Sequence, residues 1–166
     1  MLGLFLLLPV LALHARELPD YTPVLLGLAM GAYGLTQALL QIPFGRWSDR
    51  FGRKPVIAVG LGLFAAGSLI GVLAHTVAML AVARCVQGAG AVSAAVSALL
   101  ADLTRPEVRT RAMAVIGASI GLSFVLALVL APVLDGVIGV PGIFAVMLVM
   151  ALGGLALLVF AVPAEP

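Results

Sequence analysis

Charged residues are scarce in this sequence. Nine Lys and Arg and seven Asp and Glu make up 10% of the 166 residues, whereas 63% of the residues are hydrophobic and the mean hydropathy is +1.26. A soluble globular domain is typically about 25% charged and about 45–50% apolar. A water-soluble fold of this size exposes roughly a third of its unfolded surface, so it could not hide so much apolar area. The composition therefore predicts a protein whose solvent is lipid.

Cysteine is nearly absent as well. The single Cys85 excludes an internal disulfide and a cysteine metal cluster, and its apolar neighbours predict a small buried side chain. The sequence also lacks a phosphate-binding loop, an H-E-x-x-H pair and a nucleophile elbow. We therefore expect neither an enzyme nor a protein with a resident metal or cofactor.

What the chain has in abundance is apolar sequence, which divides into six stretches. They cover residues 1–14, 22–44, 55–74, 77–100, 112–134 and 142–162. About 20 helical residues cross a bilayer core of about 30 Å, and five stretches meet that length. The runs are continuously apolar without a period of two, which favours helices over a β-barrel. The fold class predicted is all-α, with six transmembrane helices.

The first stretch is too short, because its thirteen apolar residues reach only about 20 Å. It resembles the core of a signal peptide but has no basic start and no clear cleavage site. We expect it to be a transmembrane helix that lacks its beginning.

Lys and Arg are distributed unevenly among the connections. Seven lie between stretches 2 and 3 or between stretches 4 and 5, and one lies between stretches 1 and 2. Cations in short loops stay on the cytoplasmic side, so the 2–3 and 4–5 connections should be cytoplasmic. Such a periodic distribution is not typical of a nucleic-acid surface, and no nucleic-acid partner is expected.

The segment "GRWSDRFGRKP", residues 45–55, holds five of the sixteen charges. We expect Gly45 to end one helix, Gly52 to allow a tight reversal with positive φ, and Pro55 to lie in the first turn of the next helix. Asp49 adds nothing to the orientation signal, but it can accept hydrogen bonds from Arg53 or cap a neighbouring helix.

This segment resembles the G-x-x-x-D-R-x-G-R-K motif that joins helices 2 and 3 in the major facilitator superfamily. The matching residues are Gly45, Asp49, Arg50, Gly52, Arg53 and Lys54. The resemblance implies a conformational latch that holds the two transporter halves together in the outward-facing state, with Asp102 as a partner of Arg53. The alternative is a basic turn that only fixes the topology.

A second resemblance lies at "RCVQGAG", which is similar to the family's helix 4 signature R-x-x-Q-G-x-G. It implies that Arg84 and Gln87 take part in proton coupling. An Arg about 10 Å deep in a membrane costs at least about 2.5 kcal/mol, so it usually faces a wet cavity or a carboxylate. The alternative is a side chain that snorkels to the surface.

The fifth stretch contains "ALVLAPVLDG", which resembles a degraded antiporter motif, G-x-x-x-G-P-x-x-G-G. Pro132 and Gly136 match, Ala127 and Ala131 replace glycines, and Asp135 departs from the pattern. Gly117 and Gly121 add a small-residue spacing that lets helices approach closely. The resemblance implies packing against helix 8 of a second half; the alternative is a proline kink.

Tyr33, Gln37 and Gln41 are spaced four residues apart and form one polar stripe on a helix. We expect this stripe to line a substrate cavity or to bond between helices. The sequence around it, "YGLTQALLQIPFG", resembles YajR-like drug:proton antiporters within the same family.

Residues 1–166 are thus expected to form the amino-terminal six-helix half of a transporter in the bacterial inner membrane. The resemblance implies efflux of small amphipathic molecules by alternating access, with protons as the coupling ion and no cofactor. The expected partners are the lipid bilayer, a small-molecule substrate, and a missing second half or another copy. The alternative is a half-length subunit that acts structurally or by assembly. No carboxylate lies in the middle of any stretch, so the site of proton coupling stays open.

Overall fold

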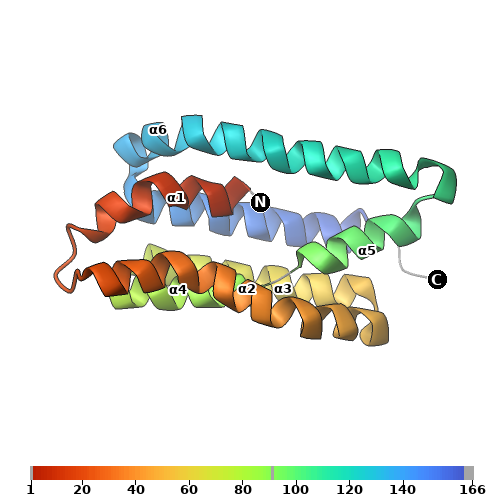
Figure 1. The fold of residues 1–166 in the computed structure, drawn as a ribbon, viewed down its shortest axis with the longest axis horizontal. Helices are drawn as coiled ribbons and strands as arrows, with labels where there is room; N and C mark the ends of the chain where they lie inside the picture. The colour runs from red at the N-terminus through yellow and green to blue at the C-terminus, as the bar shows by residue number, and fades with distance from the viewer. Residues whose placement is uncertain (1, 91, 163–166) are drawn as a thin grey trace.

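The computed structural model describes residues 2–90 and 92–162, which form six α-helices and no strand. Their order is α1 (Leu2–Ala15), α2 (Pro23–Phe51), α3 (Arg53–Val72), α4 (Val77–Ala89), α5 (Ser93–Leu103) and α6 (Pro106–Phe160). Figure 1 shows the helices lying roughly along one common axis, with α2, α3 and α4 on one side and α1 and α6 on the other. The all-α class predicted from the continuously apolar runs is confirmed.

Four helical segments of the described chain are long and apolar enough to cross a membrane. They are Pro23–Phe51, Arg53–Val72, Val77–Leu103, which comprises both α4 and α5, and Pro106–Phe160, whereas Phe5–Ala15 is a shorter apolar helix. Many large apolar side chains point outward from these helices, among them Leu39, Val129 and Val137. Outward-facing apolar side chains suit a lipid environment. The six separate spans predicted from the sequence are not confirmed, because two expected spans form a single helical element.

That element is α6, which at 1.5 Å per residue would reach about 80 Å if straight. It reverses direction instead, at Gly139, where φ is +67° and ψ is 178°. Only glycine adopts such a conformation without strain, and Pro141 lies two residues further on. Figure 1 shows the two arms running back along each other. Each arm is long enough to cross a membrane core.

The stretch predicted as one helix over residues 77–100 is interrupted. Helix α4 ends at Ala89 and α5 begins at Ser93. Gly88 packs directly against the backbone of α2, because a Cβ there would lie 2.3 Å from the Tyr33 carbonyl oxygen. A Cβ on Gly90 would lie 2.4 Å from the carbonyl oxygen of Gly60 in α3. These close approaches hold the end of α4 and its C-cap residue Gly90 against α2 and α3.

The buried apolar side chains of the described residues form three clusters. The largest joins α1 to both arms of α6 and to α4, through residues that include Leu7, Leu80, Ala127, Ala131 and Phe144. Ala127 and Ala131 are fully buried here, whereas Pro132 and Gly136 of the same motif are exposed. The alanines that replace glycine in that motif therefore pack within this chain.

Candidate functional site

The connection between α2 and α3 is shorter than predicted, because α2 does not end at Gly45. It continues for six more residues to Phe51. Gly52 alone separates the two helices, with φ of +95°. The positive φ expected at Gly52 is confirmed, and Pro55 lies in the first turn of α3 as predicted. The helical extension brings Asp49 onto the last turn of α2, one turn from Arg53 at the start of α3.

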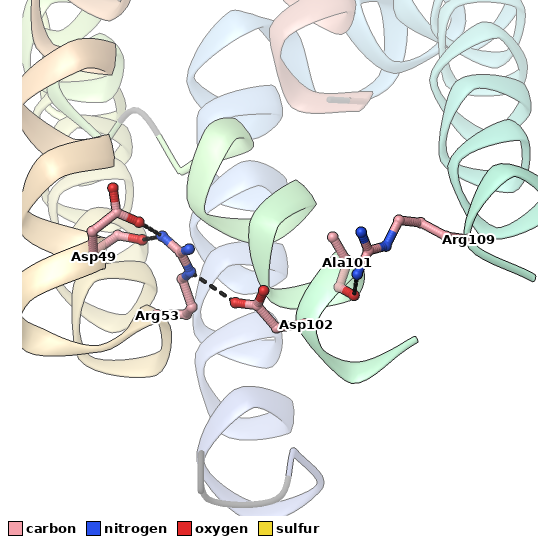
Figure 2. Close-up of polar contacts among 6 residues, drawn as sticks. Asp49, Arg53, Ala101, Asp102 and Arg109 are labelled. Carbon is pink, nitrogen blue, oxygen red and sulfur yellow. Dashed lines mark hydrogen bonds and ion pairs between the residues drawn. The ribbon is translucent and has the colours of Figure 1, made fainter. Parts of the chain in front are cut away.

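Arg53 contacts three side chains from two other helices. Its Nη1 donates to a carboxylate oxygen of Asp49 and, at 2.7 Å, to the Oγ of Ser48. Its Nε lies 3.1 Å from Oδ2 of Asp102, near the end of α5. We call these four residues, Ser48, Asp49, Arg53 and Asp102, the Arg53 cluster. Figure 2 shows Arg53 between the two carboxylates.

The solvent exposure of this cluster differs between its members. The side chains of Asp49 and Asp102 are 66% and 57% exposed, whereas that of Arg53 is 19% exposed. Exposed ion pairs typically contribute about 0.2–1 kcal/mol each, so the cluster adds little to the stability of the fold. Its geometry can link α2, α3 and α5 and still separate at low cost. Arg50 and Gly45 lie on the same helix, α2, and neither is among the residues that bind Arg53 in the described chain.

A hydrogen bond also joins the two helices on either side of the connection between α5 and α6. Nη2 of Arg109, in the first turn of α6, donates to the carbonyl oxygen of Ala101 at 3.0 Å (Figure 2). Ala101 precedes Asp102, so the ends of α5 and α6 are joined next to the Arg53 cluster. The hydrogen bond of Arg109 thus goes to the backbone of α5 rather than to the Asp102 carboxylate.

Arg84 lies in the interior of the bundle and is 1% exposed. It does not snorkel. Its Nη1 donates to Oε1 of Gln87 at 3.1 Å, and its guanidinium carbon lies 4.7 Å from the centre of the Tyr33 ring. Gln87 in turn donates through Nε2 to the Oγ of Ser68 at 2.9 Å. The Nε of Arg84 has no hydrogen-bond partner among the described residues.

A cation buried among apolar helices is costly unless it is compensated. Here the compensation comes from one amide and one aromatic ring, and no carboxylate of the described chain pairs with Arg84. No local sequence pattern connects Tyr33 or Ser68 to Arg84, because they lie on other helices. Their contribution depends entirely on how α2, α3 and α4 pack.

A cavity of about 450 Å³ lies between the helices, a size typical of small-molecule pockets. Tyr33 and Gln37 line it, together with the serines Ser93, Ser97, Ser119 and Ser123 and with apolar side chains such as Phe64 and Met147. Gln41 does not line it and is exposed on α2. The polar stripe therefore divides, with two members at the cavity and one outside.

Four further residues that the sequence singled out are exposed on the surface of the described chain. Gly117, Gly121 and Gly136 are exposed on the first arm of α6, and no atom outside that helix lies within 4 Å of a Cβ built on them. Their role in packing against another helix stays a prediction. Cys85 is exposed rather than buried as predicted, because it faces outward from α4. The residue that follows Arg84 on a helix points to a different face.

At the opposite end of the bundle, Asp20 caps α4. Its carboxylate accepts from the backbone N–H groups of Val77 at 2.7 Å and Ala78 at 3.1 Å. These bonds, that to Val77 foremost, lower the pKa of Asp20. Thr76, the N-cap residue, accepts from the N–H of Met79 at 3.1 Å. The first turn of α4 is thus held to the connection between α1 and α2.

Known proteins share this sequence pattern. The family model of the Major Facilitator Superfamily matches residues 1–166. The inner membrane transport protein YajR of Escherichia coli is 48% identical over 163 residues, which is 98% of this chain and 36% of that protein. Multidrug resistance protein 1 of Bacillus subtilis is 32% identical over 68% of this chain and 29% of that protein.

Quinolone resistance protein NorA of Staphylococcus aureus is 32% identical over 62% of this chain and 27% of that protein. The chain spans about a third of the length of the relatives it matches. All three are membrane transport or resistance proteins by name, and four helical segments here are suited to a membrane. The chain therefore belongs to the major facilitator superfamily.

Proposed function

We propose that this chain forms the amino-terminal half of a proton-coupled exporter of small amphipathic molecules. In this proposal α1, α2, α3, the α4–α5 pair and the two arms of α6 are the six transmembrane helices. A second half, or another copy, completes the carrier. Secondary transporters of this kind place substrate near the bilayer midplane and expose it alternately as their two halves rock.

The observation that carries the proposal is the Arg53 cluster. Arg53 joins Asp49 and Asp102 from two different helices, and the carboxylates are exposed, so the ion pairs can break at a cost of about 1 kcal/mol or less each. Such a cluster suits a conformational latch better than a structural anchor. In the proposed topology the cluster lies on the cytoplasmic side. The two connections at which it forms, between stretches 2 and 3 and between stretches 4 and 5, carry seven of the nine Lys and Arg residues.

Arg84 and the cavity supply the remaining parts. We assign proton coupling to Arg84 and Gln87. A buried guanidinium favours the ionised form of any carboxylate brought near it, so protonation of that carboxylate would weaken the attraction between the two groups. Tyr33 and Gln37 contribute to the substrate path, and the apolar lining of the cavity suits an amphipathic molecule. The names of two relatives, which refer to multidrug and quinolone resistance, agree with export of such compounds. The proposed location is the bacterial inner membrane, as in the name of the Escherichia coli relative.

The latch is tested with Asp49→Asn in the intact protein. This change removes one charge from the Arg53 cluster and leaves the side-chain volume nearly unchanged. Proton-driven uptake of substrate into inverted membrane vesicles, which corresponds to export from the cell, should fall while the amount of protein in the membrane stays near that of the wild type. Arg46→Gln, which removes an exposed charge from the same end of α2, is the matched control. Equal transport by Asp49→Asn and wild type would contradict the latch.

A further inference from the structure

Lys54 makes a contact that the Arg53 cluster does not include. Its Nζ donates to the backbone carbonyl oxygen of Val162 at 2.8 Å and to that of Val159 at 3.3 Å. Val159 lies in the last turn of α6, and Val162 follows two residues after its end. The last carbonyls of a helix lack intrahelical partners, and a cation there is favoured by the helix dipole. Lys54 therefore caps α6 from more than 100 residues away in the sequence.

The apolar packing around this contact is incomplete. A groove of about 360 Å³ lies between the start of α3 and the end of α6, lined by Phe51, Pro55, Ala58, Leu158 and Val159 besides Gly52 and Lys54. Leu158, one helical turn before Val162, anchors α6. It is 6% exposed and packs in the core with Val56 and Ile57. Beyond Leu158, the hydrogen bonds from Lys54 bridge the groove.

Two consecutive residues therefore connect the start of α3 to three other helices. Arg53 binds Asp49 on α2 and Asp102 on α5, and Lys54 binds the end of α6. We propose that Lys54 is a positioning residue that fixes the last turn of α6 to the start of α3. When the Arg53 cluster separates or forms, the end of α6 then moves with α3. The significance of this coupling for transport rests on the proposed function, but the coupling itself can be measured without transport.

The test places spin labels on α3 and on the end of α6. Val59→Cys and Phe160→Cys, both exposed sites outside the groove, are introduced into the intact protein after Cys85→Ser removes the native thiol. Distances between the labels are measured in lipid nanodiscs by double electron–electron resonance. The parent protein and Lys54→Arg, which keeps a cationic donor, should give one narrow distribution. Lys54→Met, which keeps the length of the side chain but has no hydrogen-bond donor, should give a broader distribution of distances.

Arg46→Gln is the matched control, since it removes a nearby cation that does not contact α6 in the described chain; it should leave the distribution narrow. An unchanged distribution in Lys54→Met overturns the proposal, as does loss of the narrow distribution in Lys54→Arg. If Lys54→Met does not fold, Lys54→Ala takes its place under the same criteria.

Transport assays separate this proposal from the latch. Lys54→Met should lower the maximal rate of efflux with little change in KM, because Lys54 lies outside the cavity. If Asp49→Asn transports normally while Lys54→Met broadens the distances, the latch is wrong and the positioning role stands. If both variants lower transport but Lys54→Met keeps the narrow distances, the positioning role is wrong and the latch stands.

Discussion

Arg53 and Asp102 are 49 residues apart in sequence, yet Nε of the first lies 3.1 Å from Oδ2 of the second. The pair joins the first residue of α3 to the penultimate residue of α5. Asp49 approaches the same guanidinium from α2, so one cation is shared between two carboxylates that lie on different helices. Such sharing allows one carboxylate to leave while the other remains, which suits a contact that must open and close.

Asp102→Asn should alter transport much more than stability. The side chain is 57% exposed, so loss of its ion pair should change the free energy of unfolding by less than about 1 kcal/mol. The proton-driven efflux rate at matched protein level should fall, because Arg53 would keep its contacts with Ser48 and Asp49 on α2 but lose its ion pair with α5. Glu107→Gln, at the start of α6, is the control acidic residue. Efflux that falls equally in both variants would mean that the pair has no specific role.

Gln87→Ala should destabilise the protein strongly. It removes the hydrogen-bond partner of a buried guanidinium, a loss worth about 1.5–3 kcal/mol, and leaves Ser68 without its donor. The same change at the exposed Gln41 should lie within about 0.5 kcal/mol of wild type. The thermal midpoint of the purified protein in detergent gives the comparison. Similar midpoints for the two variants would mean that the buried network contributes little.

Substitution of two glycines should have opposite consequences. A Cβ at Gly88 would lie 2.3 Å from the carbonyl oxygen of Tyr33, so Gly88→Ala must displace backbone and should cost about 1–3 kcal/mol. Gly121 has open space around it in α6, so Gly121→Ala should leave the unfolding free energy unchanged or raise it by up to about 1 kcal/mol.

Transport by Gly121→Ala then tests whether this face packs against another helix. Efflux lower than that of wild type, with a thermal midpoint that is unchanged or raised, would support close packing there in the intact protein. Normal efflux would exclude the packing role implied by the small-residue spacing.

The hydrogen bonds by which the Asp20 carboxylate caps α4 should make the stability of the protein depend on pH. Because its bonds to Val77 and Ala78 lower the pKa of Asp20, the folded state favours the carboxylate more than the unfolded state does. The resulting stabilisation is present above the ordinary aspartate pKa and is lost as the pH falls through the lowered value. Thermal midpoints measured from pH 7 to pH 3 should decline more steeply for wild type than for Asp20→Asn. The control variant Glu17→Gln should follow the wild-type curve; parallel curves for wild type and Asp20→Asn would contradict the cap.

Several features of the site follow from local sequence alone. The positive φ at Gly52 and the position of Pro55 could be predicted, because glycine and proline restrict the backbone wherever they stand. The end of α2 could not be predicted, since Gly45 weakens a helix without ending it when the next turn packs well. Phe44 and Ser48 are both buried on that turn, which accounts for the longer helix.

The sequence alone determined that this chain is helical, apolar enough for a membrane, and marked by an acidic and basic turn at residues 45–55. These properties arise from hydropathy and backbone preference, which act over a few residues. Only the tertiary structure decided that Arg84 stacks on Tyr33, that Lys54 caps α6, that Gln41 lies outside the cavity, and that α6 reverses at Gly139. Such contacts depend on which helices pack together, and the free energy of that packing is summed over the whole bundle.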